Sequence, residues 1–171
     1  MRKTYIYPIS ARINRINSNP YLEDFMNSLQ KNFVFLNREK PSDKGLLDVF
    51  GYISEMKYIF FHWPENIPDR KFGLFQTMMF FLLSVIFRLK GIRMIYVLHN
   101  KISHSKRRLF LKRFISHYLI KHSYRILTHA SDGVEFVNDI SRRRDKDVFY
   151  FPHPVKEIKS SPGIVKTIDV L

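Results

Sequence analysis

Histidine side chains recur where apolar runs of the sequence end. Four of the seven histidines stand at or just past the ends of such runs, namely His62, His99, His129 and His153. Asn100 stands next to His99, and both side chains can donate and accept hydrogen bonds. If each apolar run is a strand of one parallel sheet, these polar groups lie at its carboxyl edge, where such sheets bind ligands. The pattern therefore indicates a polar binding site that can hydrogen-bond to hydroxyl groups.

The residues after His62 add an aromatic ring, Trp63, and a carboxylate, Glu65. A sugar suits this set, because its apolar face stacks on aromatic rings and its hydroxyls need hydrogen-bond partners. Another interpretation remains open for each residue. In that interpretation His62 ends a strand and hydrogen-bonds to a backbone carbonyl, and the lone Trp63 covers the core. His129 precedes Ser131, a residue type that commonly caps a helix.

Several other kinds of chemistry lack their sequence signals. There is no G-x-G-x-x-G after the first apolar run and no P-loop, so the usual dinucleotide and nucleoside triphosphate fingerprints are absent. No H-E-x-x-H spacing indicates a metal site, and no G-x-S-x-G elbow indicates a serine hydrolase. The lack of cysteine excludes thiolate ligands and nucleophiles. Asp43, Asp48 and Glu55 show no evident pairing, so neither a metal site nor a carboxylate pair is predicted.

The apolar runs alternate with helical patterns, and this order sets the predicted fold. Strands are predicted at residues 4–9, 33–36, 57–62, 92–98, 124–128 and 147–151. Helices are predicted at residues 21–31, 46–54, 72–89, 105–121 and 131–140. Such alternation produces a parallel sheet joined by right-handed crossovers. We therefore expect an α/β domain with a Rossmann-like parallel sheet of about six strands and helices on both faces.

The predicted domain spans residues 1–158, and residues 159–171 are interpreted as a hinge followed by the first strand of a second domain. The most apolar segment, residues 72–87, contains Gln76, Thr77 and Ser84. A membrane-spanning helix needs about 20 apolar residues, and this segment is shorter, so a buried or interfacial helix is expected. The N-terminal residues do not have the apolar stretch of a signal peptide.

The net charge of +14 is the strongest compositional signal, and a surface of this sign attracts polyanions. Five basic residues gather in one short segment, namely Lys106, Arg107, Arg108, Lys112 and Arg113. Apolar side chains interleave with them, and the apolar segment 72–89 lies close by in the sequence. A cationic helix beside an apolar one favours an anionic membrane surface. A solvated basic face and nucleic-acid binding remain alternatives, although no recognised nucleic-acid motif is present.

Four short elements stand in an order that is typical of one family. They are His62-Trp63-Pro64-Glu65 after a strand, His99-Asn100-Lys101 after the next, His129 with Ser131 and Glu135, and Phe151-Pro152-His153-Pro154. Together they resemble the N-terminal half of bacterial GT-B glycosyltransferases. The similarity is greatest to family-4-like enzymes of capsule and exopolysaccharide synthesis, above all Bacteroides-like members, and covers about residues 1–158. The Gly-rich first loop common in that family is replaced here by residues 10–19.

In that family, two Rossmann-like domains face each other across a cleft, and the N-terminal one binds the acceptor. The resemblance implies an enzyme that transfers a sugar from a nucleotide sugar to a glycan acceptor, lipid-linked in this type, during surface polysaccharide synthesis. It also implies candidate catalytic residues, His99 and His129. The implied acceptor-binding residues are Ser10, Asn14, His62, Trp63, Glu65, His99, Asn100, Lys101, His104 and His129.

The family's donor-binding elements do not occur in these 171 residues. No cofactor is therefore expected in this chain, a nucleotide sugar is expected in the full-length enzyme, and the chain alone is expected to be inactive. The implied partners are a glycan or lipid-linked acceptor, an anionic membrane surface, and a C-terminal donor domain or partner subunit. The implied location is cytoplasmic, on the inner face of the cytoplasmic membrane. Two alternatives are a stand-alone membrane-associated acceptor subunit of a split glycosyltransferase and a basic nucleic-acid-binding α/β protein.

Overall fold

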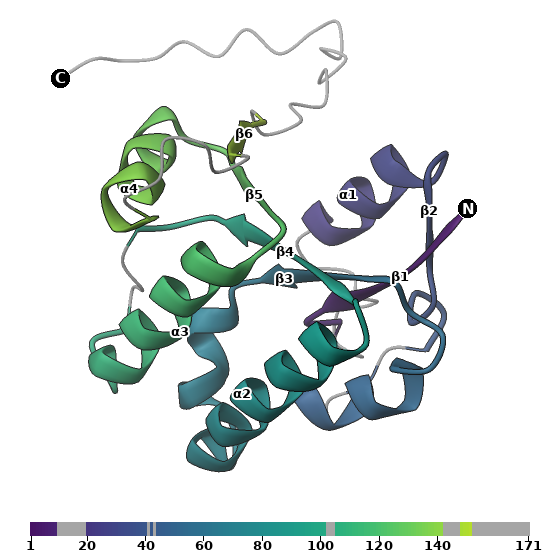
Figure 1. Ribbon diagram of the computed structural model, residues 1–171, viewed down its shortest axis with the longest axis horizontal. Helices are drawn as coiled ribbons and strands as arrows, with labels where there is room; N and C mark the ends of the chain where they lie inside the picture. The colour runs from purple at the N-terminus through teal and green to yellow at the C-terminus, as the bar shows by residue number, and fades with distance from the viewer. Residues whose placement is uncertain (10–19, 41, 43, 102–104, 142–147, 152–171) are drawn as a thin grey trace, which may run out of the picture.

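Six parallel strands form the sheet at the centre of the computed structural model (Figure 1). In spatial order they are β2 (Phe33–Phe35), β1 (Arg2–Tyr7), β3 (Tyr58–His62), β4 (Arg93–Leu98), β5 (Arg125–Thr128) and β6 (Val148–Tyr150). The structure describes residues 1–9, 20–40, 42, 44–101, 105–141 and 148–151. The predicted α/β class and the all-parallel sheet of six strands are confirmed.

The connections between strands are helical. They comprise four α-helices and two 3-10 helices within the described residues: α1 (Tyr21–Leu29), η2 (Gly45–Tyr52), η3 (Pro64–Asp69), α2 (Gly73–Leu89), α3 (Leu109–His122) and α4 (Ser131–Ser141). The segment predicted as a helix at 46–54 is a 3-10 helix, and η3 was not predicted. The predicted hinge and following strand at 159–171 lie outside the described residues.

The helix predicted from residue 105 begins at Leu109 instead. Arg108 has a φ of 50°, in the left-handed region that a right-handed helix cannot include. Its guanidinium donates a hydrogen bond to the carbonyl oxygen of Pro68 in η3. This contact between two connections helps to hold the chain in place just before α3.

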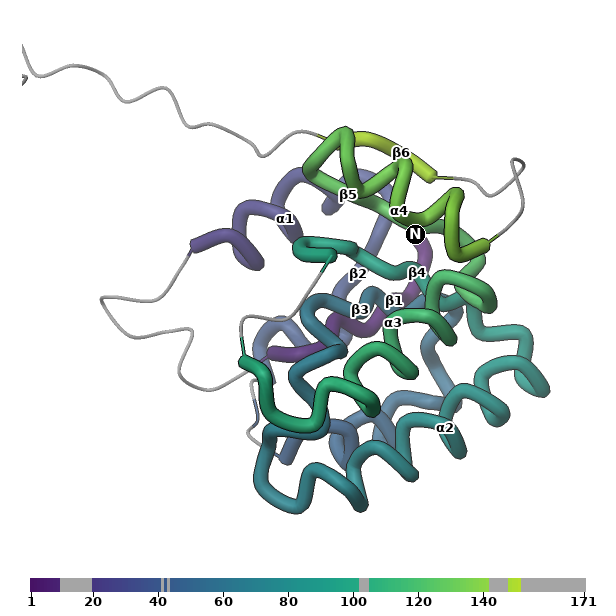
Figure 2. The backbone as a smooth tube through the Cα atoms, turned by 90° about the vertical axis from the view of Figure 1, so that its left-hand side faces the viewer, coloured from purple at the N-terminus to yellow at the C-terminus, as the bar shows by residue number. Residues whose placement is uncertain are grey.

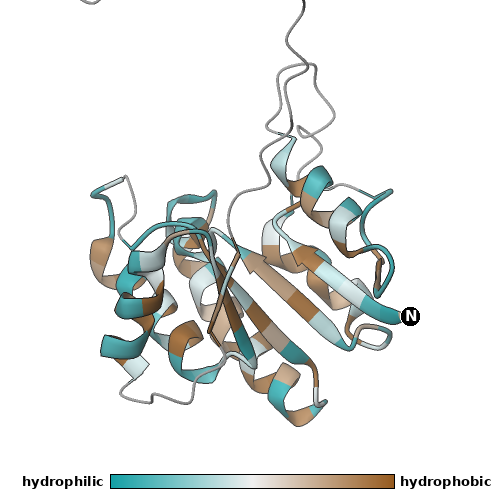
Figure 3. Cartoon of the chain, turned by 90° about the horizontal axis from the view of Figure 1, so that it is seen from above, coloured by the Kyte–Doolittle hydropathy of each residue, from teal (hydrophilic) through white to brown (hydrophobic). Residues whose placement is uncertain are grey.

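The core lies on both faces of the sheet, since every residue of β3 is buried. On one face, α1 packs its Phe25 ring 5.3 Å from that of Phe60 in β3. On the other face, η2, α2, α3 and α4 contribute Leu46, Phe80, Ile115 and Val137 to a second cluster. Figure 2 shows α1 apart from α2 and α3, and Figure 3 shows apolar residues running along the central strands. Helices on both faces were predicted and are confirmed.

The strand order determines where a ligand site is expected. β1 lies between β2 and β3, so the chain moves to one side of β1 to form β2 and then crosses to the other side to form β3. In open parallel sheets of this type, ligands bind outside the carboxyl ends of the strands at such a reversal. β3, which ends at His62, is one of the two strands at this point. None of the helices in the described segments is long and apolar enough to cross a bilayer.

Candidate functional site

Three of the predicted site histidines meet at the carboxyl edge of the sheet. His62 is the last residue of β3, while His99 and His129 directly follow β4 and β5. The ring centroids of His62 and His99 are 5.3 Å apart, and those of His99 and His129 are 5.1 Å apart. Adjacent parallel strands in register bring these residues side by side, because His62 pairs with Val97 and Leu98 pairs with Thr128.

Tyr21, the first residue of α1, lies across the three histidines. Its ring centroid is 5.7 Å from that of His62, 5.1 Å from that of His99 and 5.5 Å from that of His129. Trp63 stacks on His99, with ring centroids 4.2 Å apart and planes inclined by 17°, and its ring centroid is 5.7 Å from that of Tyr21. These five residues are called the histidine cluster below. Tyr21 was not among the predicted site residues, although the helix predicted at residues 21–31 begins with it.

The hydrogen bonds of His129 define its proton positions. Its Nδ1 lies 2.6 Å from the carbonyl oxygen of Phe151, which can only accept, so Nδ1 donates. In a neutral imidazole Nε2 is then the acceptor, and the Tyr21 hydroxyl, 2.7 Å away, donates to it. Burial raises the pKa of Tyr21, which keeps this hydroxyl protonated. Both nitrogens of His129 are therefore engaged, and it can act as a general base only if Tyr21 moves.

His62 is the buried member of the histidine cluster, with 0% of its surface exposed. Its Nδ1 lies 3.1 Å from Nε2 of His99, and its own Nε2 is buried without a hydrogen-bond partner among the described residues. Burial and then the neighbouring charges of His99 and His129 lower the pKa of His62 well below its usual value. His62 is thus neutral at pH 7 and orients the ring of His99 through Nδ1.

A buried charged group lies beside this edge, between η3 and α3. The Lys112 side chain is 2% exposed, and its Nζ lies 2.5 Å from a carboxylate oxygen of Asp69. The same Nζ donates to the carbonyl oxygen of Ser105 at 3.0 Å. Desolvation opposes the charge of Asp69, but the hydrogen bond and charge of Lys112 together lower its pKa. Burial raises the pKa of Glu65, and the charge of Lys112 offsets only part of that rise.

Glu65, Asn100 and Lys101 do not face the histidine cluster. They line a separate small cavity of about 30 Å³, whose other walls come from α3 and α4. Nζ of Lys101 lies 3.4 Å from a carboxylate oxygen of Asp132 at the start of α4. The residues predicted to bind the acceptor are therefore divided between two places. Of the others, Ser10, Asn14 and His104 lie outside the described residues, as does His153.

No group of three or more His, Asp or Glu side chains within the described ranges is arranged to hold a metal ion. The histidine cluster does not form such a group, because Nε2 of His129 is bonded to Tyr21 and Nδ1 of His62 to His99. Its accessible part consists of the half-buried Trp63, His99 and His129. These three rings lie at the carboxyl edge of the sheet and offer an aromatic surface on which another ring can stack.

A second feature is an exposed apolar strip on α2 and α3, called the α2/α3 surface. Phe72 and Met78 are each 72% exposed, and the exposed positions on α2 recur every three or four residues. The ring of Phe81 lies 5.1 Å from that of Phe114 and so connects the two helices. The residues of the surface are Phe72, Leu74, Phe75, Met78, Leu82, Val85, Leu89, Phe110 and Phe114.

The basic residues predicted to bind a membrane differ in their accessibility. Lys106, Arg107 and Arg113 are exposed, and Arg108 is half-buried. Arg107 and Arg108 line the same depression as Phe72, at one end of the α2/α3 surface. Lys112 was wrongly included in this set, because it is buried and paired with Asp69. Lys112 lies on the buried side of α3, and the run of basic residues in the sequence did not indicate this.

Comparison with known protein families, curated proteins and solved structures finds no significant match to this chain.

Proposed function

We propose that this chain is the acceptor-binding domain of a glycosyltransferase and that it works at an anionic membrane surface. The observation that carries the proposal is the convergence of His62, His99 and His129 at the carboxyl edge of the sheet. This edge lies beside the reversal of strand order, where open parallel sheets bind ligands. The proposal also draws on the family resemblance of the sequence.

The chemistry of the histidine cluster suits a sugar hydroxyl. An acceptor hydroxyl must lose a proton as it attacks the donor sugar, and a neutral imidazole can accept it. His62 is held neutral by burial and orients His99, which is half-buried and stacked on Trp63. His129 positions the Tyr21 hydroxyl through the hydrogen bond at 2.7 Å. In this proposal His99 contacts the acceptor, while His62 and His129 are positioning residues.

The membrane part of the proposal is supported by the α2/α3 surface. Exposed phenylalanine, leucine and methionine side chains lie on two adjacent helices, and Arg107 and Arg108 stand near one end of the strip. Apolar side chains that insert between lipids, flanked by cations that attract anionic headgroups, are typical of interfacial helices. This arrangement favours a lipid surface over nucleic acid, which offers no apolar layer.

Trp63 provides a direct test of acceptor binding, because it is the only tryptophan in the chain. Its emission would be followed while methyl glycosides and a water-soluble prenyl-diphosphate-linked monosaccharide are added. Saturable changes are expected, and His99→Asn should weaken binding by about tenfold, the effect of losing one well-formed hydrogen bond. His117→Asn, on the exposed side of α3, is the control and should bind as the unaltered chain does. Equal affinities for all three proteins, or no change with any glycan, would contradict the proposal.

Transfer itself is tested with a radiolabelled nucleotide sugar. We expect no transfer by this chain alone, and transfer when a separate donor-binding chain is added if the enzyme is split. Robust turnover by the isolated chain would refute its assignment as an acceptor domain alone.

Vesicle flotation tests the membrane part. The chain should float with vesicles rich in phosphatidylglycerol. Burying a Phe or Met side chain contributes about 1.5–3 kcal/mol, so Phe75→Ser with Met78→Ser should lower partitioning at least about tenfold. Val34→Ser on β2 removes an exposed apolar side chain elsewhere and is the control. Failure to float, combined with duplex DNA binding that weakens steeply with salt, would favour nucleic acid instead.

A further inference from the structure

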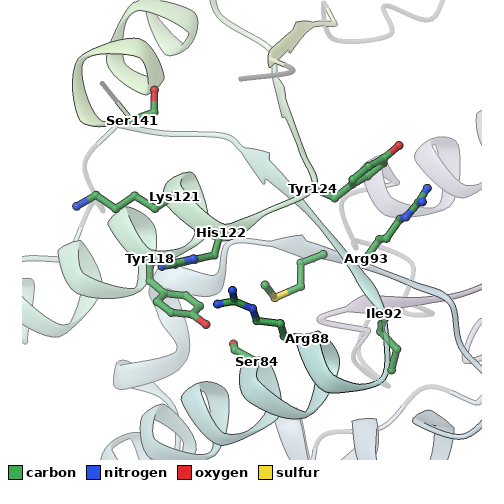
Figure 4. Close-up of a pocket in the computed structure, with 11 residues that line it drawn as sticks. Ser84, Arg88, Ile92, Arg93, Tyr118, Lys121, His122, Tyr124 and Ser141 are labelled. Atoms are coloured by element: carbon green, nitrogen blue, oxygen red, sulfur yellow. The ribbon is translucent and has the colours of Figure 1, made fainter. Parts of the chain in front are cut away.

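A large hollow lies at the amino-terminal edge of the sheet, opposite the histidine cluster. It has a volume of about 900 Å³. Figure 4 shows its two walls, with Ser84 and Arg88 from α2 on one side and Tyr118, Lys121 and His122 from α3 on the other. The start of β4 forms the floor through residues 91–94, and Tyr124 and Ser141 complete the rim. We call it the basal hollow.

The basal hollow is cationic. Arg88 comes from the last turn of α2, Arg93 opens β4, and Lys121 and His122 come from the last turn of α3. No aspartate or glutamate belongs to its lining in the described part of the chain. No ion pair found between described residues involves Arg88, Arg93 or Lys121. Two segments that are distant in sequence, residues 88–93 and 121–122, thus place basic residues in the lining of one hollow.

Arg93, one cationic group of the lining, and the neighbouring His122 ring are each held in position by aromatic side chains. The Arg93 guanidinium donates a hydrogen bond to the Tyr58 hydroxyl at 3.2 Å and lies 4.4 Å from the centroid of Tyr124. The His122 ring lies 4.4 Å from that of Tyr118. A cation fixed by such contacts loses less conformational entropy when an anion binds.

The ends of the two helices explain only part of this charge. The C-terminal turn of a helix attracts a cation, which accounts for a basic residue at the end of α2 and at the end of α3. Arg93 belongs to a strand and has no such reason to be there. The hollow also has two tyrosine side chains, Tyr118 and Tyr124, in its lining.

We propose that the basal hollow binds a phosphate group. Arginine guanidinium groups match phosphate oxygens in geometry and charge, lysine adds a point charge, and tyrosine hydroxyls can donate to the remaining oxygens. The phosphate is that of a soluble phosphate ester or of a lipid headgroup. Leu89, the 82% exposed end of the α2/α3 surface, directly follows Arg88, so a lipid headgroup can reach the hollow from the surface of a bilayer. This site is separate from the histidine cluster and does not depend on the function proposed for it.

The test is calorimetric titration with inorganic pyrophosphate and, separately, with dihexanoyl phosphatidic acid below its micelle concentration. Salt is held near 0.1 M, where the Debye length of about 10 Å suppresses distant charge effects. The test variant is Arg88→Gln with Lys121→Gln. The control variant is Lys31→Gln with Lys40→Gln, which removes the same charge from exposed positions outside the hollow.

Saturable binding of either probe is expected, with at least about a tenfold loss in the test variant and less than a twofold loss in the control. Binding of pyrophosphate and phosphatidic acid alike identifies a general phosphate site, whereas binding of phosphatidic acid alone identifies a lipid headgroup site. The proposal is overturned if neither probe binds, or if both variants lose affinity equally, since the attraction is then only that of net charge. Trp63 emission should not change in these titrations, because it reports on the opposite edge.

Discussion

The burial of His62 makes the stability of this protein depend on pH in a defined way. Its pKa is lowered in the folded state by burial and by the charges of His99 and His129, whereas an unfolded chain has the usual value of 6.5. Below pH 6.5 the unfolded chain binds a proton that the folded protein does not bind. Stability therefore falls as pH is lowered from 6.5 toward the folded pKa, and is retained above 6.5.

The size of this effect follows from one proton. Each pH unit well below 6.5 costs about 1.4 kcal/mol, and the integrated loss between pH 7 and 5.5 is about 1.3 kcal/mol. For a domain of this size, 1 kcal/mol shifts Tm by about 2–4 °C, so Tm should fall by about 3–5 °C through this residue. His62→Asn keeps a polar group near Nδ1 but removes the titration, and its Tm should lose this part of the pH dependence.

The assay is differential scanning fluorimetry of the unaltered chain, His62→Asn and the control His117→Asn at a series of pH values. The quantity compared is the slope of Tm against pH, so an overall loss of stability in a variant does not affect the conclusion. Burial raises the pKa of Glu65, and the stability it contributes is present at low pH and lost as pH rises through its folded pKa. This opposite trend is common to all three proteins and cancels in the comparison. Equal slopes for the unaltered chain and His62→Asn would refute the reasoning.

Three further substitutions test the packing, each by urea denaturation. Lys112→Met leaves Asp69 without its ion-pair partner and should lower the free energy of unfolding by about 3–5 kcal/mol. Lys3→Met breaks the exposed pair with Glu55 and should lower it by at most about 1 kcal/mol, so equal losses would contradict the burial of Lys112. Phe80→Ala empties part of the core and should lower the free energy of unfolding by about 3–5 kcal/mol. Met78→Ala, at an exposed position, should change it by no more than about 0.5 kcal/mol, and a large loss would mean that the α2/α3 surface is covered. Gly73→Ala places a Cβ against the Pro68 carbonyl and should lower the free energy of unfolding by about 1–3 kcal/mol, whereas the Cβ of Gly51→Ala meets no atom within 4 Å and should be tolerated. If Gly73→Ala left the free energy of unfolding unchanged, it would contradict the close approach of α2 to η3.

The strands could be predicted because their residues are apolar on both faces. The run at Tyr58–His62 is buried at every position, as a strand of a parallel sheet between two helical layers requires. The same reasoning located His62, His99 and His129 at strand ends, since a parallel sheet aligns its carboxyl ends. The adjacency of these three residues depends on the strand order, which places β3, β4 and β5 next to one another and which the alternation of elements did not specify.

The features that were missed depend on contacts between distant segments. Arg108 determines where α3 begins by adopting a left-handed conformation next to Pro68 of η3, and no helical periodicity contains that information. Lys112 belongs to a basic run in the sequence but is buried by its pairing with Asp69. The basal hollow also has no sequence signature, because Arg88 and Lys121 are ordinary residues for the last turn of a helix. Only the packing of α2 beside α3 brings them together.

The single helix on one face of the sheet has a consequence for local motion. Among the described residues, α1 is the helix on that face, and it has nine residues held by Tyr21, Leu22, Phe25 and Met26. Short elements with few buried side chains open at lower free energy than the rest of a protein, so the amides of α1 should exchange with solvent hydrogen before those of α2. Opening of α1 also withdraws Tyr21 from His129 and dismantles the histidine cluster. A ligand bound there should slow exchange in α1 and leave α2 unaffected, which makes the order of this helix a measure of how fully the site is occupied.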